Sequence, residues 1–286
     1  MDRLSKNQKC PLDRFRLEPS LIFRLAGLKP DPWQEEVLSS NASQTCLLCS
    51  RQVGKTLTAS AVALRTALLE APALVLVLSP SERQSGEFMQ KVKTFYNTLK
   101  KPRKVASTLK TVHEVKTESE VLDSAWAAMP EVAKESALQF HLKNGSRIIG
   151  LPAKLATVLG YSGVSLLVLD EASRVPDDLY RGVRPMLATS RGRLLALSTP
   201  FGKRGWFYEA WEKGGAAWKR HRIGADKCQR IPKAFLEEEL IALGERWYRQ
   251  EYFCSFEENM DSVFLRSDID AACDNDLQPL DVQGVW

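Results

Sequence analysis

Residues 45–60 of the chain read TCLLCSRQVGKTLTAS. A short apolar run ends at Cys49, Gly-Lys-Thr follows at 54–56, and the residues after it have strong helix propensity. Strand, loop and helix in this order are typical of a phosphate-binding loop, written G-x-x-x-x-G-K-[ST]. Cys49 occupies the place of the first glycine in that pattern. For this stretch alone, the alternative is a Gly-Lys-Thr turn that arose by chance.

Each residue of the motif has a role in such a loop. Gly54 allows backbone N–H groups to converge on a phosphate, and the helix N-terminus adds its dipole. Lys55 would reach the β- and γ-phosphates, and the hydroxyl of Thr56 would bind Mg²⁺. The stretch therefore predicts a nucleotide triphosphate site.

A second apolar stretch, LLVLDEAS at 166–173, completes the pattern. A strand that ends in Asp170 would hold the magnesium through water, and Glu171 would polarise the attacking water. The alternative is an Asp-Glu pair that only matches a helix N-terminal dipole. Together with Gly-Lys-Thr upstream, the pair predicts an ATPase that uses ATP and Mg²⁺.

Two further stretches add to this order. Ser198, Thr199 and Pro200 follow the apolar run RLLAL, where small hydroxyl groups can bond a γ-phosphate or its water. Taken alone they form only a turn, but after the first two motifs they predict a coupling segment. Upstream, the amide of Gln34 can both donate to and accept from an adenine edge, with Trp33 packed beside it. The alternative for Trp-Gln is simple packing at a helix start.

The composition is that of a globular protein. The chain has 286 residues, 44% of them hydrophobic, with 40 Lys and Arg against 35 Asp and Glu. A net charge of +5 is compatible with nucleic acid without proving it. The first ten residues contain no apolar secretory segment, and the apolar runs are too short to span a membrane. We expect a cytoplasmic protein that does not contact membranes.

Cysteine and histidine do not form a metal or disulfide framework. Six Cys show no framework spacing, and three His show no cluster. Cys46 and Cys49 form a C-x-x-C, but residues three apart on a strand point to opposite faces. Two buried thiols are therefore expected rather than a zinc or redox pair.

The pattern along the chain predicts an α/β fold: a P-loop NTPase of the ASCE or RecA-like type with a mostly parallel sheet flanked by helices. Continuously apolar strands such as ALVLVLS suit a sheet buried on both faces. Asn144-Gly145 predicts a type I′ hairpin. We expect strands at 45–49, 73–79, 137–142, 147–151, 165–170, 193–198 and 217–223, and helices near 33–39, 55–70, 82–99, 177–188, 204–213 and 232–253.

The expected domains follow from these elements. Residues 1–224 form the ATPase core with an N-terminal extension, and 225–265 form a small helical lid. Residues 266–286 are expected to form a linker. Residues 100–135, rich in lysine, are interpreted as a variable insertion with one strand and one helix.

In order, PWQ (32–34), SRQVGKT (50–56), LLVLDEAS (166–173) and LSTP (197–200) resemble the large terminase subunits of tailed bacteriophages, the motors that pump DNA into an empty capsid. An Arg-Gln phosphate loop with a non-glycine first position is a feature of that family. NGSRIIGLPA, GYSGVSLLVLDEA and FGKRGWFYEAW also resemble family stretches, so the similarity covers roughly residues 30–265.

The resemblance implies roles for particular residues. Gln34 would contact adenine, Arg51 would sense or stabilise the γ-phosphate, and Asp170 and Glu171 would take the metal and base roles. The implied nucleotide-binding set is Trp33, Gln34, Ser50, Arg51, Gln52, Val53, Gly54, Lys55, Thr56 and Asp170, with coupling through Ser198, Thr199 and Pro200.

The resemblance also implies partners. These are double-stranded DNA, further copies of the chain in a ring on a capsid portal, and a small terminase subunit, all in the cytoplasm of an infected or lysogenic bacterial host. Candidate DNA contacts are the basic residues of 100–104, Lys203, Arg204, Lys219, Arg220 and Arg222, each with a plain solvated surface as its alternative.

The chain departs from the family pattern in two respects. Leu159-Gly160 stands where the family often has Arg-Gly, so the arginine finger that acts on a neighbour's site has Arg147, Lys154 and Arg174 as substitutes. In addition, the chain ends at PLDVQGVW, before the first catalytic Asp of the family's nuclease domain would appear. We expect no nuclease activity.

Two other functions remain open from the sequence. A superfamily 2 helicase or translocase shares similar motifs, but it needs a second RecA-like lobe for which the chain has no room. A non-catalytic DNA-binding or assembly subunit with a decayed nucleotide site is the other alternative, against which the intact Lys55, Asp170 and Glu171 speak.

Overall fold

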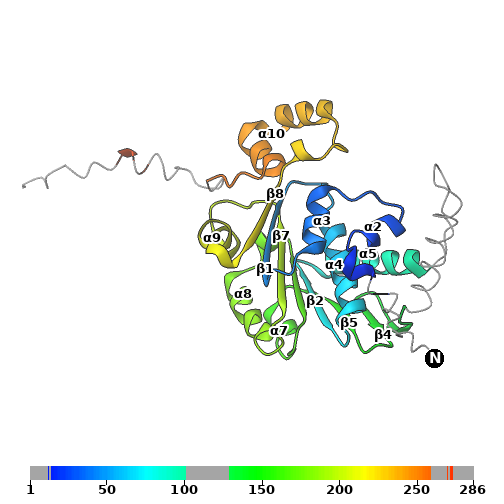
Figure 1. Cartoon of the computed structure of the whole chain (residues 1–286). Helices are drawn as coiled ribbons and strands as arrows, with labels where there is room; N and C mark the ends of the chain where they lie inside the picture. Colours follow the sequence, from blue (N-terminus) through cyan, green and yellow to red (C-terminus); the bar gives the residue numbers. More distant parts are fainter. Residues whose placement is uncertain (1–11, 13, 101–128, 259–268, 270, 273–286) are drawn as a thin grey trace, which may run out of the picture.

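The computed structural model describes residues 12, 14–100, 129–258, 269, 271 and 272. Its centre is an eight-stranded sheet with the order β3-β4-β5-β2-β6-β7-β1-β8 (Figure 1). The strands are β1 (Gln44–Cys49), β2 (Leu74–Ser79), β3 (Val132–Glu135), β4 (Gln139–Leu142), β5 (Arg147–Pro152), β6 (Leu166–Asp170), β7 (Arg193–Ser198) and β8 (Lys219–Ile223).

Helices cover both faces of this sheet (Figure 1). On one side lie α1 (Arg14–Leu17), α2 (Leu21–Leu25), α3 (Pro32–Ser39), α4 (Lys55–Leu69) and α5 (Glu82–Lys100). On the other lie α7 (Leu155–Val158), α8 (Asp177–Val183) and α9 (Gly205–Lys213), with the short 3₁₀ turns η2 (Ala172–Arg174) and η3 (Arg184–Leu187). The turns η4 (Gly215–Ala217) and η5 (Ala225–Lys227) flank β8, and α10 (Lys233–Phe253) follows.

The strands that carry the motifs are parallel and in register. β1 pairs with β7, and β7 pairs with β6, so that Leu48 lies opposite Ser198 and Asp170 lies opposite Leu197. The carboxyl ends of β1, β6 and β7 therefore lie at one edge of the sheet. This edge is where ligands of open α/β sheets bind.

The interior strands are buried on both faces, as predicted. Alternate residues of β1 enter different cores: Leu47 and Cys49 pack with α4, whereas Cys46 and Leu48 pack on the side of α8 and α9. The predicted opposite orientation of Cys46 and Cys49 is thus confirmed. Both thiols are fully buried, and burial raises the pKa of each far above its ordinary value.

The predicted mostly parallel α/β fold is confirmed, as is the hairpin between β4 and β5. The prediction of a type I′ turn at Asn144-Gly145 was wrong. Such a turn needs a positive φ at both central residues, whereas the described non-glycine residues with positive φ are Gln52, Glu171, Arg191 and Cys254. Gly145 alone takes the left-handed conformation (φ 87°), and its N–H bonds the carbonyl of Leu142 at 3.1 Å.

The sequence did not predict the short helices α1, α2 and α7. They are too short to show a hydrophobic period. Within the lysine-rich insertion the structure places β3, while residues 101–128 lie outside the described part.

The helix α10 is interrupted at Gly244, whose φ of 72° and ψ of 162° are accessible to glycine almost alone. Its two halves contact each other, because the hydroxyl of Tyr252 donates to Glu239 Oε2 at 2.8 Å and the Tyr252 ring meets Phe235 edge to face. The continuous helix expected over 232–253 is therefore a bent pair.

The division at residues 224 and 265 stays a prediction, and most of 266–286 lies outside the described residues. In the described part of the chain, no helix combines the length and the apolar character that a bilayer crossing requires.

Candidate nucleotide site

The loop between β1 and α4 has the backbone of a phosphate cradle. Gly54 is left-handed with φ 93°, as is Gln52 with φ 61°, and α4 begins at Lys55. The start of the loop is fixed because the N–H of buried Ser50 bonds the Ile223 carbonyl of β8 at 2.8 Å. The N–H groups at the start of α4 have no intrahelical partners, so this end of the helix suits an anion.

The structure brings the two predicted motifs together. Lys55 Nζ lies 2.9 Å from Glu171 Oε1, and the two side chains are only 12% and 22% exposed. Glu171 follows β6 in a left-handed conformation with φ 52°. The lysine of the phosphate loop and the candidate base therefore face each other across one small site.

Asp170 is the most perturbed acid of this site. It is 5% exposed, and its Oδ1 accepts the N–H of Glu171 at 3.1 Å. Burial first, and then the charge of Glu171, raise its pKa to about 6, against the lowering effect of Lys55 and Lys91. A carboxylate held out of water in this way favours a cation beside it.

The residues present fit a magnesium ion that is shared with a substrate. Across the described ranges, no group of three or more His, Cys, Asp or Glu forms a metal cage. Mg²⁺ usually binds through one or two protein oxygens together with substrate phosphates and water. Asp170 and the Thr56 hydroxyl would supply such oxygens.

A groove of about 1280 Å³ runs from Gly54 past Gln34. The Gln34 amide is 3% exposed and fixed in orientation, because Nε2 donates to Thr58 Oγ1 at 2.9 Å and Oε1 accepts from the Asp31 N–H at 2.8 Å. One N–H and one lone pair remain, which is the pair that an adenine edge needs. Trp33, in the first turn of α3, packs against the core.

The sequence comparison supports what this geometry indicates. Residues 46–271 match the protein family described as "Terminase large subunit, T4likevirus-type, N-terminal". The chain belongs to this family. A search among curated proteins finds no match.

Solved terminase structures share the fold of this chain. The large terminase ATPase domain of Thermus phage P74-26 is 20% identical over 82% of this chain and 96% of that one, with a TM-score of 0.62. The HK97 bacteriophage large terminase is 14% identical over 80% of this chain, with a TM-score of 0.56. The large terminase of a thermophilic bacteriophage, in complex with ADP, is 12% identical over 79% of this chain, with a TM-score of 0.55. This terminase chain covers 50% and 53% of the latter two.

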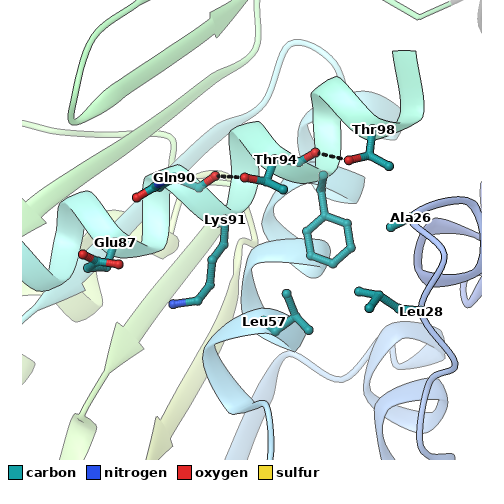
Figure 2. Close-up of a pocket in the computed structure, with 9 residues that line it drawn as sticks. Ala26, Leu28, Leu57, Glu87, Gln90, Lys91, Thr94 and Thr98 are labelled. Atoms are coloured by element: carbon teal, nitrogen blue, oxygen red, sulfur yellow. Dashed lines mark hydrogen bonds between the residues drawn. The ribbon is translucent and has the colours of Figure 1, made fainter. Parts of the chain in front are cut away.

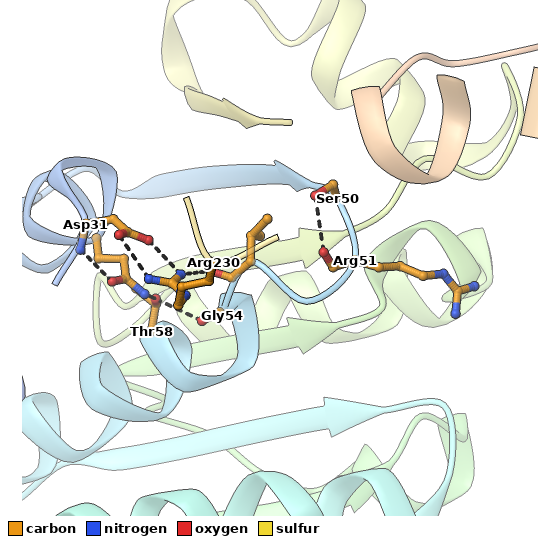
Figure 3. Close-up of polar contacts among 8 residues, drawn as sticks. Asp31, Ser50, Arg51, Gly54, Thr58 and Arg230 are labelled. Atoms are coloured by element: carbon orange, nitrogen blue, oxygen red, sulfur yellow. Dashed lines mark hydrogen bonds and ion pairs between the residues drawn. The ribbon is translucent and has the colours of Figure 1, made fainter. Parts of the chain in front are cut away.

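Arg51 belongs to the phosphate loop of this terminase chain, but its side chain does not point into the loop. Its side chain extends away from Gly54 (Figure 3) and forms an ion pair with Glu251 of α10. The Arg51 N–H also bonds the Glu251 carbonyl at 3.2 Å. The phosphate loop is thus attached to the second half of α10, a link that the sequence motifs did not reveal.

The predicted coupling segment, Ser198 to Pro200, is attached to two other parts of the terminase chain. Ser198 Oγ lies 2.6 Å from Ser173 Oγ in the loop after Glu171, and both Ser198 and Thr199 are buried. Just beyond Pro200, the Gly202 N–H bonds Oε1 of buried Gln250 at 3.3 Å. Neighbouring residues of α10 therefore hold both the coupling loop and the phosphate loop.

The finger candidates lie in different places. Arg147 begins β5, at the sheet edge opposite the phosphate loop, and Lys154 is exposed just before α7. Arg174 is exposed near Glu171, with its guanidinium 4.2 Å from the centre of the Phe201 ring. Arg204 lies 4.8 Å from the same ring. Within the described residues, neither Arg174 nor Arg204 forms an ion pair with a carboxylate.

The other DNA-contact candidates are mostly engaged within the protein. Arg220 donates to the carbonyls of Gly215 and Ala210, and Arg222 donates to the carbonyl of Phe253. Lys203 lies 4.0 Å from Glu258. Lys219 begins β8, the edge strand that pairs with β1, and residues 101–104 lie outside the described residues.

A second, smaller cavity of about 440 Å³ lies between α4 and α5 (Figure 2). Lys91 extends from α5 toward α4 there, and its charge is one of those that lower the pKa of Asp170. No sequence pattern marks Lys91, because a single lysine on an amphipathic helix resembles any surface residue.

Proposed function

We propose that this terminase chain hydrolyses ATP with Mg²⁺ and thereby drives double-stranded DNA into a procapsid. It would act as one of several copies in a ring at a capsid portal, with a small terminase subunit delivering the DNA. The observation that carries the proposal is the 2.9 Å contact between Lys55 and Glu171 beside the buried Asp170. A lysine, a metal-binding acid and a second carboxylate in one site are the parts that ATP hydrolysis requires.

Binding begins with the phosphates of ATP at the start of α4. Lys55 would leave Glu171 for the β- and γ-phosphates, and the adenine would lie in the groove beside Gln34. Thr56 and Asp170 would hold Mg²⁺, which when bound neutralises the charge that develops on the phosphates.

Release of Lys55 leaves the Glu171 carboxylate free to act as a base. Glu171 would accept a proton from water as the water oxygen bonds to the γ-phosphorus and the bond to the bridging oxygen of ADP breaks. The strand order supports this assignment, because only β7 lies between β6 and β1.

Hydrolysis would be transmitted through hydrogen bonds that change with the γ-phosphate. Ser198 is bonded to the loop of Glu171, and Gly202 is bonded to α10. Loss of phosphate would therefore shift the coupling loop and α10 together. This supports a role for the helical segment as the moving output of the motor.

Phosphate release from ATP tests the enzymatic part of the proposal. We expect turnover that needs Mg²⁺ and disappears in Glu171→Ala, while the exposed Glu209→Ala retains it. Turnover that survives in Glu171→Ala, or no ATP binding at all, would overturn the proposal.

DNA translocation needs a separate assay with portal-bearing procapsids and the complete packaging machinery. Protection of DNA from nuclease in the presence of ATP is expected for a packaging motor. Strand separation without packaging would instead indicate a helicase, and binding of DNA without ATP turnover would indicate an assembly subunit.

A further inference from the structure

Arg230 is placed at the nucleotide groove by a segment that the motifs do not include. It lies between η5 and α10, two residues before Pro232, which precedes the first turn of α10. Its guanidinium forms a two-pronged ion pair with Asp31, with Nη1–Oδ1 at 3.1 Å and Nη2–Oδ2 at 2.8 Å (Figure 3). Nη2 also donates to the Val53 carbonyl of the phosphate loop at 3.2 Å.

These contacts hold the guanidinium directly beside the phosphate cradle. A Cβ built on Gly54 would lie 4.0 Å from Arg230 Nη2 and 3.2 Å from Gln34 Nε2. Arg230 and Gln34 therefore flank the same point of the loop. Both line the 1280 Å³ groove, together with the apolar side chains of Pro30, Pro32 and Leu57.

Both terminal nitrogens of the Arg230 guanidinium form hydrogen bonds, yet the side chain is not buried. The side chain remains 53% exposed despite the bonds to Asp31 and Val53. A guanidinium held at its edge presents a planar cation, which stacks on aromatic rings. The groove is thus built with a hydrogen-bonding amide on one side and a flat cation on the other.

We infer that Arg230 covers the purine base of the bound nucleotide, stacking on its face while Gln34 reads its edge. The inference rests on the proposed nucleotide site and adds a base-contacting residue to it. A consequence is that the base joins α3 to the segment that leads into α10. Nucleotide binding would then affect α10 through contacts with the base as well as through contacts with the phosphates.

The experiment separates the base from the phosphates. The affinities of ATP and of inorganic tripolyphosphate are measured for the unaltered chain, Arg230→Gln and Arg230→Lys, with exposed Arg246→Gln of α10 as the matched control. For Arg230→Gln we expect ATP to bind about tenfold more weakly, as for loss of one cation–π contact, and tripolyphosphate to bind as before. Arg230→Lys keeps the charge without the planar face, so it should not restore ATP affinity.

Three results would overturn the inference while leaving the proposed site intact. These are equal loss of ATP and tripolyphosphate, no loss of either, or full ATP affinity in Arg230→Lys. Intact tripolyphosphate binding also shows that the variant is folded at the site. If the unaltered chain binds neither compound, the proposed nucleotide site itself fails, and the inference fails with it.

Discussion

Lys55 Nζ is 2.9 Å from Glu171 Oε1, so the lysine expected to hold phosphate is paired with the acid expected to activate water. The pair joins the loops that follow β1 and β6, two strands that are far apart in the chain but separated in the sheet only by β7. In the free protein each charge neutralises the other. Under the proposed function, ATP would therefore compete with Glu171 for the lysine.

This competition predicts that Glu171→Gln binds ATP more tightly than the unaltered chain. Removing a partly exposed ion pair releases Lys55 at a saving of about 1 kcal/mol, or roughly fivefold in affinity. Titration with a slowly hydrolysed ATP analogue measures the effect, and Lys55→Ala should lose binding altogether. Weaker binding in Glu171→Gln would show that the carboxylate supports the ligand instead of competing with it.

The raised pKa of Asp170 predicts a pH-dependent cost in stability. Its pKa is about 6 in the folded chain against an ordinary value of 3.8. Protonated Asp170 therefore contributes its full stabilisation of the folded chain below about pH 4, and this contribution is lost as the pH rises through 6. A shift of this size corresponds to about 3 kcal/mol at neutral pH.

Asp170→Asn should remove that cost. Urea unfolding without nucleotide or metal should show the variant to be about 3 kcal/mol more stable than the unaltered chain at pH 8, and nearly equal to it at pH 4. The exposed Asp226→Asn serves as the control. The same difference at both pH values would refute the assignment of the shift to Asp170.

Gly54→Ala and Gly86→Ala form a matched pair. At Gly54, φ is 93° and a new Cβ would lie 3.2 Å from Gln34 Nε2, so we expect about 1–2 kcal/mol of destabilisation and loss of ATP binding. Gly86 lies within α5, and a Cβ there meets no atom within 4 Å. Its replacement should stabilise the protein by about 0.5–1 kcal/mol. Thermal unfolding distinguishes the two signs.

Gln250→Ala tests the link between the coupling loop and α10. The variant leaves the buried Gly202 N–H without its partner, which costs about 1–3 kcal/mol. Hydrogen exchange should accelerate in residues 245–253 and around Gly202, while the exposed Gln90→Ala changes neither. Unchanged exchange would mean that the hydrogen bond does not hold the two segments together.

Arg174 and Arg204, whose guanidinium groups lie over the Phe201 ring, predict a measurable change in DNA binding. If each arginine contacts one DNA phosphate, Arg174→Gln and Arg204→Gln should each make the plot of log affinity against log salt concentration less steep by about 0.9. If Arg174 instead acts on the ATP of a neighbouring copy, its replacement should slow ATP turnover in the assembled ring and leave the salt slope unchanged. The exposed Arg191→Gln, in the turn before β7, is the control.

The sequence by itself determined the fold class, and it predicted the residues Lys55 and Glu171 that the structure brings together in the candidate site. Hydrophobic periodicity and composition suffice to predict a buried parallel strand, since a run such as LVLVLS at 74–79 has no polar face. The local sequence also suffices to predict the phosphate loop, because its motif, Gly54, Lys55 and Thr56, consists of adjacent residues where α4 begins.

Only the tertiary structure decided which distant residues complete the site. A segment far downstream in the chain contacts the loops of the candidate site through Arg230, Gln250 and Glu251. The ion pair between Arg51 and Glu251 likewise became visible only in the structure. A side chain's partner across the fold depends on packing and not on its neighbours in sequence, so no local pattern carries that information.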